Sequence, residues 1–207
     1  MSYQTLIDSF QSVLNRDDCT TAKADGFIQQ GIRRLQREVR LPCMEREMAT
    51  IVTNSGTSSV FVPTDLLSIQ DVLVSDTNTP TPRPLKKIGY RELVLVNPTT
   101  PPSVYARLRG QIGIAGSLNQ GAIVRVLYYG TFSNLESFAA ENEVTAGFPD
   151  VAMYAGLVFA ASSFTHPSKG SWETDYQTLK TALIDEAVEL EMTGGPQAIT
   201  PLYSEGF

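Results

Sequence analysis

The residues that could do chemistry in this chain are few, and the first is its single histidine. His166 precedes Pro167 in a short turn-forming stretch. A metal site needs several ligands, and a lone histidine with no cysteine nearby cannot supply them. A lone histidine is also more often structural than catalytic, so we expect a structural role for His166.

Paired carboxylates are the next candidates, because general acid–base catalysis often uses two acidic side chains. Glu141 is followed by Glu143, and Glu189 by Glu191. Residues two apart do not face each other on a helix, so neither pair forms an acid–base site by itself.

The sequence contains no nucleophile elbow, no phosphate-binding loop and no dinucleotide fingerprint. Gly110, Gly113 and Gly116 are spaced by three residues between predicted strands, where turns or bulges account for them. Cys19 and Cys43 are too few and too far apart for a metal knuckle, and we expect two reduced thiols. The residues therefore predict no catalytic, cofactor or metal site.

Charge is unevenly distributed along the 207 residues. The net charge is −6, with +2 over residues 1–140 and −8 over residues 141–207. A dedicated nucleic-acid binder would show a basic surplus, so this class is disfavoured. Complementary faces between copies of the chain are one interpretation, and a solvated acidic helix face is the other.

The element that must organise the fold is the stretch from Phe148 to Phe164. It carries no charge after Asp150, begins with Pro149 and is apolar on every face. Such a helix is buried, and it is shorter than the roughly 20 residues that span a bilayer. The spacing predicts a central core helix whose small residues let neighbours approach closely.

Other helices are predicted around it from the spacing of apolar residues. They cover Tyr3 to Leu14, Ala24 to Val39, and a long helix that is capped by Ser171 and ends near Met192. The last one has a predicted inward stripe that includes Trp172, Tyr176 and Val188, and a predicted acidic outer face.

Between the helices the apolar period changes from about four residues to two. Ala49–Thr53 and Ser59–Val62 are predicted to form a hairpin, followed by a strand near Ile69–Val74 and an exposed loop from Ser75 to Pro84. Gly89–Val96 is predicted as one helical or extended element. Three more strands are predicted at the end of this region: Val104–Arg109, Gln111–Ala115 and Ala122–Tyr129.

These elements predict an α+β protein. Residues 1–46 and 141–192 form a helical bundle, 47–140 form an inserted β-rich antiparallel lobe, and 193–207 form an extended C-terminal arm. The arm has two prolines and four large apolar residues, a composition that suits docking onto a partner. Plain disorder is the alternative. The four residues are Ile199, Leu202, Tyr203 and Phe207.

Several short motifs occur in a shared order over roughly residues 2 to 185. They are Tyr3 to Ile7, Asn15-Arg16-Asp17, the arginines from Arg33 to Arg40, Met48 to Thr50, Val60 to Leu67, Val126 to Tyr129, Phe148 to Leu157, and Trp172 with Tyr176. In this order they resemble the phage adaptor family, the head-to-tail adaptors of tailed bacteriophages, including the tail tubular protein A type. The stretch 76–84 and the segment after Gly194 depart from the family.

The resemblance implies a structural virion protein with no enzymatic activity and no cofactor. It implies a ring of about twelve copies between the portal protein and the tail nozzle or tail tube protein, with a tail fibre as a further candidate partner. Double-stranded DNA would pass through the ring without sequence recognition, and the C-terminal arm would reach the portal. We expect no membrane partner, manufacture in the host cytoplasm and a final place in the neck of the virion.

A ring needs two different faces on each copy that meet between neighbours. The candidate pair of faces is a basic group on one helix and an acidic group on another. The residues are Arg33, Arg34, Arg37 and Arg40 on the first, and Asp185, Glu186, Glu189 and Glu191 on the second.

Two other classes stay open. One is a siphovirus-type head-completion or tail-terminator ring, which differs in subunit number and neighbours. The other is an enzyme, such as a cell-wall hydrolase, whose carboxylates meet only in the fold.

Overall fold

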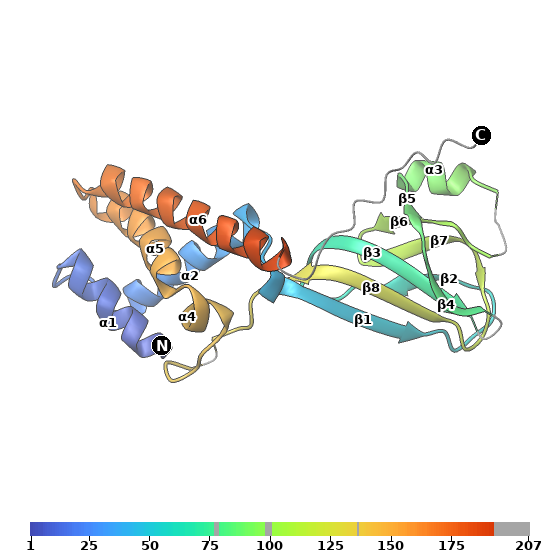
Figure 1. Ribbon diagram of the computed structural model, residues 1–207. Helices are drawn as coiled ribbons and strands as arrows, with labels where there is room; N and C mark the ends of the chain where they lie inside the picture. The colour runs from blue at the N-terminus through green and yellow to red at the C-terminus, as the bar shows by residue number, and fades with distance from the viewer. Residues whose placement is uncertain (77–78, 98–100, 136, 193–207) are drawn as a thin grey trace. The chain divides into compact units, whose positions relative to one another are not determined.

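The computed structural model describes the backbone of residues 1–76, 79–97, 101–135 and 137–192 (Figure 1). Contacts divide the chain into two compact units. One consists of Met1–Pro42 and Phe132–Phe207, and the other of Cys43–Thr131. Helices and two mainly antiparallel sheets are both present, so the α+β class is confirmed.

The unit boundaries lie four and nine residues before those expected from the sequence, at Pro42/Cys43 and Thr131/Phe132. After Thr131 the chain contacts the helices. The Phe132 ring packs 5.6 Å from that of Phe148, and the Ser133 hydroxyl donates a 2.8 Å hydrogen bond to Glu143.

The first two helices of the helical unit follow the sequence closely. Helix α1 spans Tyr3–Leu14 and α2 spans Thr21–Glu38, with the side chains of Ser2 and Thr20 capping their first turns. Their buried faces follow the apolar spacing of the sequence, except that Val13 of α1, expected on the buried face, is 42% exposed. A short helix α4, Glu143–Gly147, was not expected, and Asn142 caps it.

Helix α5, Pro149–Phe164, is the buried core helix that the sequence predicts. It packs on α2 at a crossing of two glycines. A Cβ atom on Gly31 would lie 2.6 Å from the backbone nitrogen of Gly156, so the two helix backbones are in contact. The prediction that small residues of α5 allow close approach is confirmed.

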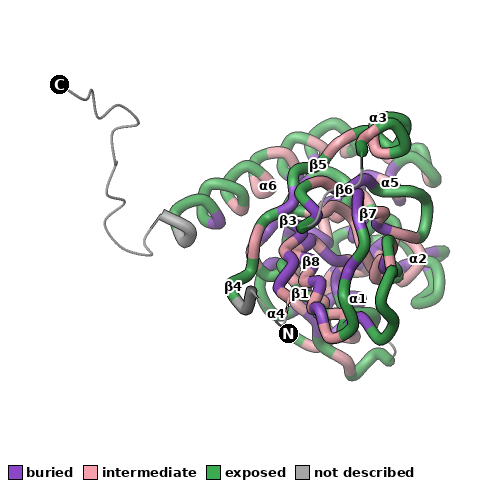
Figure 2. The backbone as a smooth tube through the Cα atoms, turned by 90° about the vertical axis from the view of Figure 1, so that its right-hand side faces the viewer, coloured by how far each residue is buried: buried purple, intermediate pink, exposed green. Residues whose placement is uncertain are grey.

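Helix α6, Lys169–Met192, begins two residues before the predicted Ser171 cap. The Trp172 amide donates to the carbonyl of Ser168, which starts the helix, and the Ser171 hydroxyl donates to that same carbonyl instead of capping. Trp172 and Tyr176 are buried as expected. Val188 is 43% exposed, because the C-terminal part of α6 is mostly uncovered (Figure 2).

The β unit contains two four-stranded sheets within its described residues, with strand orders β1-β8-β3-β4 and β2-β7-β6-β5. The strands of the first sheet are β1 (Glu45–Ile51), β8 (Ile123–Gly130), β3 (Leu66–Asp76) and β4 (Thr79–Pro84). Those of the second are β2 (Thr57–Phe61), β7 (Gln111–Leu118), β6 (Val104–Leu108) and β5 (Lys86–Lys87), where β5 runs parallel to β6. A short 3-10 turn, Pro42–Met44, precedes β1.

The two sheets share one apolar core. Val72, Val126 and Tyr128 of the first sheet form a cluster with Val60 and Ile112 of the second. Strand β8 alternates strictly between buried and half-buried residues, which explains why its sequence is the clearest strand of the chain.

The predicted hairpin is wrong. Strands β1 and β2 belong to different sheets: Met48 pairs with Val126, and Val60 pairs with Ile112. The turn around Gly56 therefore passes from one sheet to the other. Each strand pairs with a longer strand that lies far along the chain, β1 with β8 and β2 with β7.

The predicted exposed loop from Ser75 to Pro84 is also wrong. Leu73 pairs with Pro84 and Val74 with Arg83, so β4 is the edge strand beside β3. Prolines are tolerated on an edge strand, where the missing N–H group need not join the ladder.

Candidate interaction surfaces

Of the residues that could do chemistry, His166, Glu141 and Glu143 make contacts that support the fold. The His166 ring stacks on Trp172 at 4.7 Å, and its Nδ1 accepts a 3.2 Å hydrogen bond from the Ser168 amide. Glu141 lies 3.3 Å from the N-terminal amine, and Glu143 accepts bonds from Ser133. These contacts tie chain segments of the helical unit together.

Glu189 is exposed on α6, and Glu191 lies in the same helix, with a side chain outside the description. Within the described residues no group of three metal-ligating side chains comes together, and no described helix is long and apolar enough to cross a membrane. Cys19 is a buried free thiol and Cys43 an exposed one.

The glycines at 110, 113 and 116 have separate roles. Gly110 lies in the turn between β6 and β7, and Gly116 has a φ of 123° on β7, opposite a register shift in β2. These two confirm the interpretation as turns or bulges. Gly113 instead lies under helix α3, Tyr90–Leu95, where a Cβ atom would come within 2.9 Å of Leu93 Cδ2.

Arg34 is the centre of a charged cluster within the helical unit. Its guanidinium donates two hydrogen bonds to Glu173 of α6, at 2.6 and 2.8 Å, and one of 2.8 Å to Glu38 of α2. It also lies 4.3 Å from the centre of the Tyr176 ring. Tyr176 and Lys180 each donate a further bond to Glu38. We call these five residues the Arg34 cluster.

The two carboxylates of the Arg34 cluster are shifted toward their charged form. The hydrogen bonds from Arg34 lower the pKa of Glu173 to about 2. Burial opposes the charge on Glu38, but the bonds from Lys180, Arg34 and Tyr176 lower its pKa to about 2. Burial and the bond to Glu38 raise the pKa of the Tyr176 hydroxyl. The cluster joins α2 to α6 through paired charges.

The other three predicted arginines differ in their surroundings. Arg33 and Arg37 are exposed and form no ion pair with any residue that the structure describes. Arg40 donates to the backbone carbonyls of Gln36 and Val39. Subunit contact stays a prediction for this group, and Arg34 already has partners in its own chain.

The predicted acidic partners lie near the end of α6. Asp185, Glu186 and Glu189 are exposed, and Asp185 and Glu186 form no ion pair within the described residues. Their role in subunit contact stays a prediction. The predicted portal-docking residues Ile199, Leu202, Tyr203 and Phe207 lie outside the described residues.

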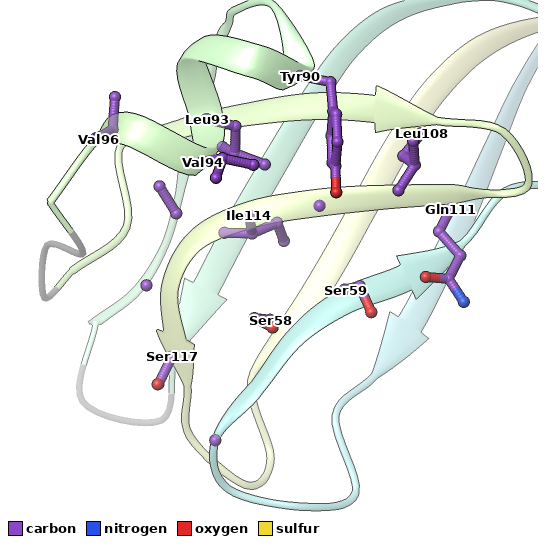
Figure 3. A pocket seen from close by; sticks show the side chains of 14 residues that line it. Ser58, Ser59, Tyr90, Leu93, Val94, Val96, Leu108, Gln111, Ile114 and Ser117 are labelled. Atoms are coloured by element: carbon purple, nitrogen blue, oxygen red, sulfur yellow. The ribbon is translucent and has the colours of Figure 1, made fainter.

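A groove that sequence reasoning missed lies in the β unit. Helix α3 packs on β6 and β7, and a space of about 510 Å³ remains between it, β7 and β2 (Figure 3). Tyr90 and Val94 of α3 border the groove and are 45% and 67% exposed. None of the described residues that line it is charged. We call it the α3 groove.

The sequence carries a signal for the α3 groove that is visible in retrospect. Ser59 of β2, Ala106 of β6 and Gly113 of β7 are small and lie beside one another in register. A row of small side chains across a sheet leaves room for a helix on that face. Tyr90–Leu95, with its apolar residues, is the nearest segment that fills it.

The open surfaces of the chain indicate what kind of contacts it makes. Its described open surfaces are helix faces with exposed charges and an uncharged groove bordered by an edge strand. Such surfaces suit contacts with other proteins.

Comparison with known families identifies the chain more closely. The family model of the SU10 adaptor protein matches residues 1–200, and the chain therefore belongs to the SU10 adaptor protein family, a family of structural bacteriophage adaptors. The resemblance to the phage head-to-tail adaptors is confirmed. No curated protein matches the sequence.

Proposed function

We propose that this protein forms a ring of about twelve copies in the neck of the virion, between the portal protein and the tail nozzle. The observation that carries the proposal is the family match over residues 1–200. The ring completes the filled head, extends the DNA channel and gives the tail a platform on which to assemble.

The charge distribution supports a passive role toward DNA. Because residues 141–207 carry a net charge of −8, we expect this region to bind DNA phosphates weakly. An acidic channel wall repels the DNA backbone, so the genome passes without being retained or read.

Copies of the chain meet through opposite charges in this proposal. The basic side chains are those of Arg33, Arg37 and Arg40, since Arg34 is paired with Glu38 and Glu173. The acidic side chains come from exposed carboxylates of α6, either Asp175 near its start or Asp185 and Glu186 near its end.

The C-terminal arm, with Ile199, Leu202, Tyr203 and Phe207, reaches the portal. Truncation after Thr193 tests this part of the proposal. We expect the truncated chain to keep its helical circular-dichroism signal and its unfolding temperature, and to lose co-sedimentation with portal rings of the same virus. Equal co-sedimentation of the full and truncated chains would remove the arm from the docking contact.

The α3 groove is the candidate contact for the tail protein, because it is uncharged, open and next to the edge strand β2. Val94→Asp places a charge on its border and should weaken binding of the tail nozzle protein. Leu95→Asp is the matched control, since Leu95 is 78% exposed on the same helix but does not line the groove. Equal binding by both variants would remove the α3 groove from the tail contact.

A further inference from the structure

The exposed face of α2 is basic and lies opposite its buried face. Gln30, Arg33 and Arg37 are exposed and spaced by three and four residues, so they lie along one stripe of the helix. Ile28 and Leu35, which are fully buried, lie on the other side. The stripe formed by Gln30, Arg33 and Arg37 is called the α2 stripe.

A hollow with the opposite charge lies between α5 and α6. Asp150 and Tyr154 of α5 and Asp175, Thr178 and Leu179 of α6 line a groove of about 270 Å³. Tyr154 and Leu179 are half-buried, whereas Asp150 and Asp175 are exposed. Neither carboxylate forms an ion pair with the described residues. We call this hollow the α5–α6 groove.

The α2 stripe and the α5–α6 groove point away from each other in one copy. Helix α5 contacts α2 through Ala152 and Gly156, which lie against Gly31. Asp150 and Tyr154 each lie two residues before one of these, which is a rotation of about 200° around α5. Asp150 and Tyr154 therefore lie on the far side of α5 from α2, and the α2 stripe faces away from α5.

We infer that the α2 stripe of one copy docks into the α5–α6 groove of the next, with Arg33 and Arg37 pairing with Asp150 and Asp175. Two complementary surfaces on opposite sides of one unit meet only between copies, in a head-to-tail contact that closes into a ring or continues as a filament. This inference rests on the proposed ring function and names the acceptor surface for the basic face.

The Arg34 cluster shows that this chain already uses the same chemistry. There a guanidinium lies 4.3 Å from a tyrosine ring and bonds two carboxylates. The α5–α6 groove offers a tyrosine ring and two carboxylates without a described cationic partner. The acidic residues at 185–189 lie on an exposed stretch of helix α6.

Charge exchange tests this contact in the full chain. Arg37→Glu and Asp175→Arg should each weaken self-association about tenfold or more, measured by light scattering at concentrations where the unsubstituted chain assembles. Each copy carries both surfaces, so the double variant Arg37→Glu/Asp175→Arg places exchanged charges at every contact. It should recover most of the lost association.

Asp185→Arg is the matched control, because Asp185 is an exposed acidic residue of α6 outside the α5–α6 groove. It should assemble normally and should not rescue Arg37→Glu. Rescue by Asp185→Arg in place of Asp175→Arg would overturn the inference in favour of the α6 terminus. Thermal unfolding of each variant verifies that the fold is intact.

The outcomes also separate this inference from the adaptor proposal. Rings that form equally well with Asp175→Arg overturn the contact and leave the adaptor function standing. A chain that never self-associates, with or without portal rings, removes the adaptor proposal. In that case a cross-linking experiment decides the contact. Arg37→Cys chains are mixed with Asp175→Cys chains, and both carry Cys43→Ser. Absence of a cross-linked dimer overturns the contact.

Discussion

At the scale of single residues, Arg34 differs from its neighbour Arg33 although both are arginines of the same helix. The Arg34 side chain is 17% exposed and contacts Glu38, Glu173 and the Tyr176 ring. The Arg33 side chain is exposed and has no described ion pair. The two positions form a natural comparison of a paired and an unpaired charge.

Arg34→Ala should reduce the free energy of unfolding by about 1–3 kcal/mol, between the values for exposed and buried ion pairs. It leaves Glu38 and Glu173 without their shared cation. Arg33→Ala should change the free energy by less than about 0.5 kcal/mol. Chemical denaturation of both variants measures the difference, and equal effects would refute a stabilising Arg34 cluster.

The same cluster makes stability depend on pH. Glu38 and Glu173 have pKa values lowered from 4.5 to about 2 in the folded chain. Their contribution is therefore complete above pH 4.5 and is lost as the pH falls from there toward 2. The stability difference between the unsubstituted chain and Arg34→Ala should shrink from pH 7 to pH 3. A difference that stays constant over this range would contradict the shifted pKa values.

Sequence reasoning found the arginine group but could not tell its members apart. The partner of Arg34 is Glu173, 139 residues away, on a helix whose position depends on α5. The periodicity of α2 shows that Arg33, Arg34 and Arg37 lie off the buried stripe. It does not show which of them another helix covers.

At the scale of elements, the crossing of α2 and α5 depends on two glycines. Gly31→Ala places a Cβ atom 2.6 Å from the Gly156 nitrogen, and a backbone atom cannot move aside as a flexible side chain can. We expect a loss of about 1–3 kcal/mol of unfolding free energy from overpacking.

Gly26→Ala is the control for this substitution. Gly26 lies in the same helix, and a Cβ atom there would meet nothing within 4 Å. Alanine favours the helix by up to about 1 kcal/mol, so this variant should be slightly more stable. Thermal unfolding compares the two, and a neutral Gly31→Ala would show that the helices need not touch.

Elements with local signals were predicted well, and elements with distant partners were not. Helix α1 has the expected bounds because its apolar spacing and its cap are both local. The pairing of β1 was missed because its partner β8 is the last strand of the β unit. Met48 of β1 lies opposite Val126 of β8, and the other strands lie between them in the sequence. A short turn such as the one at Gly56 can join two paired strands of a hairpin, or two strands that belong to different sheets, and the local sequence does not distinguish the two.

At the scale of the whole molecule, the described outer surfaces of the subunit suit contacts with other proteins. In the proposed assembly, the α2 stripe and the α5–α6 groove form the contact between copies, and the α3 groove contacts the tail. Each is made from a few residues on rigid elements, so single substitutions can separate one contact from another without unfolding the chain.

The central claim is that copies of this chain assemble into a ring on the portal. The native mass of the purified 22.6 kDa chain, alone and after mixing with portal rings of the same virus, tests it most directly. We predict that portal rings gain a mass equal to about twelve copies of the chain. A chain that stays monomeric and leaves the mass of the portal ring unchanged would contradict the account.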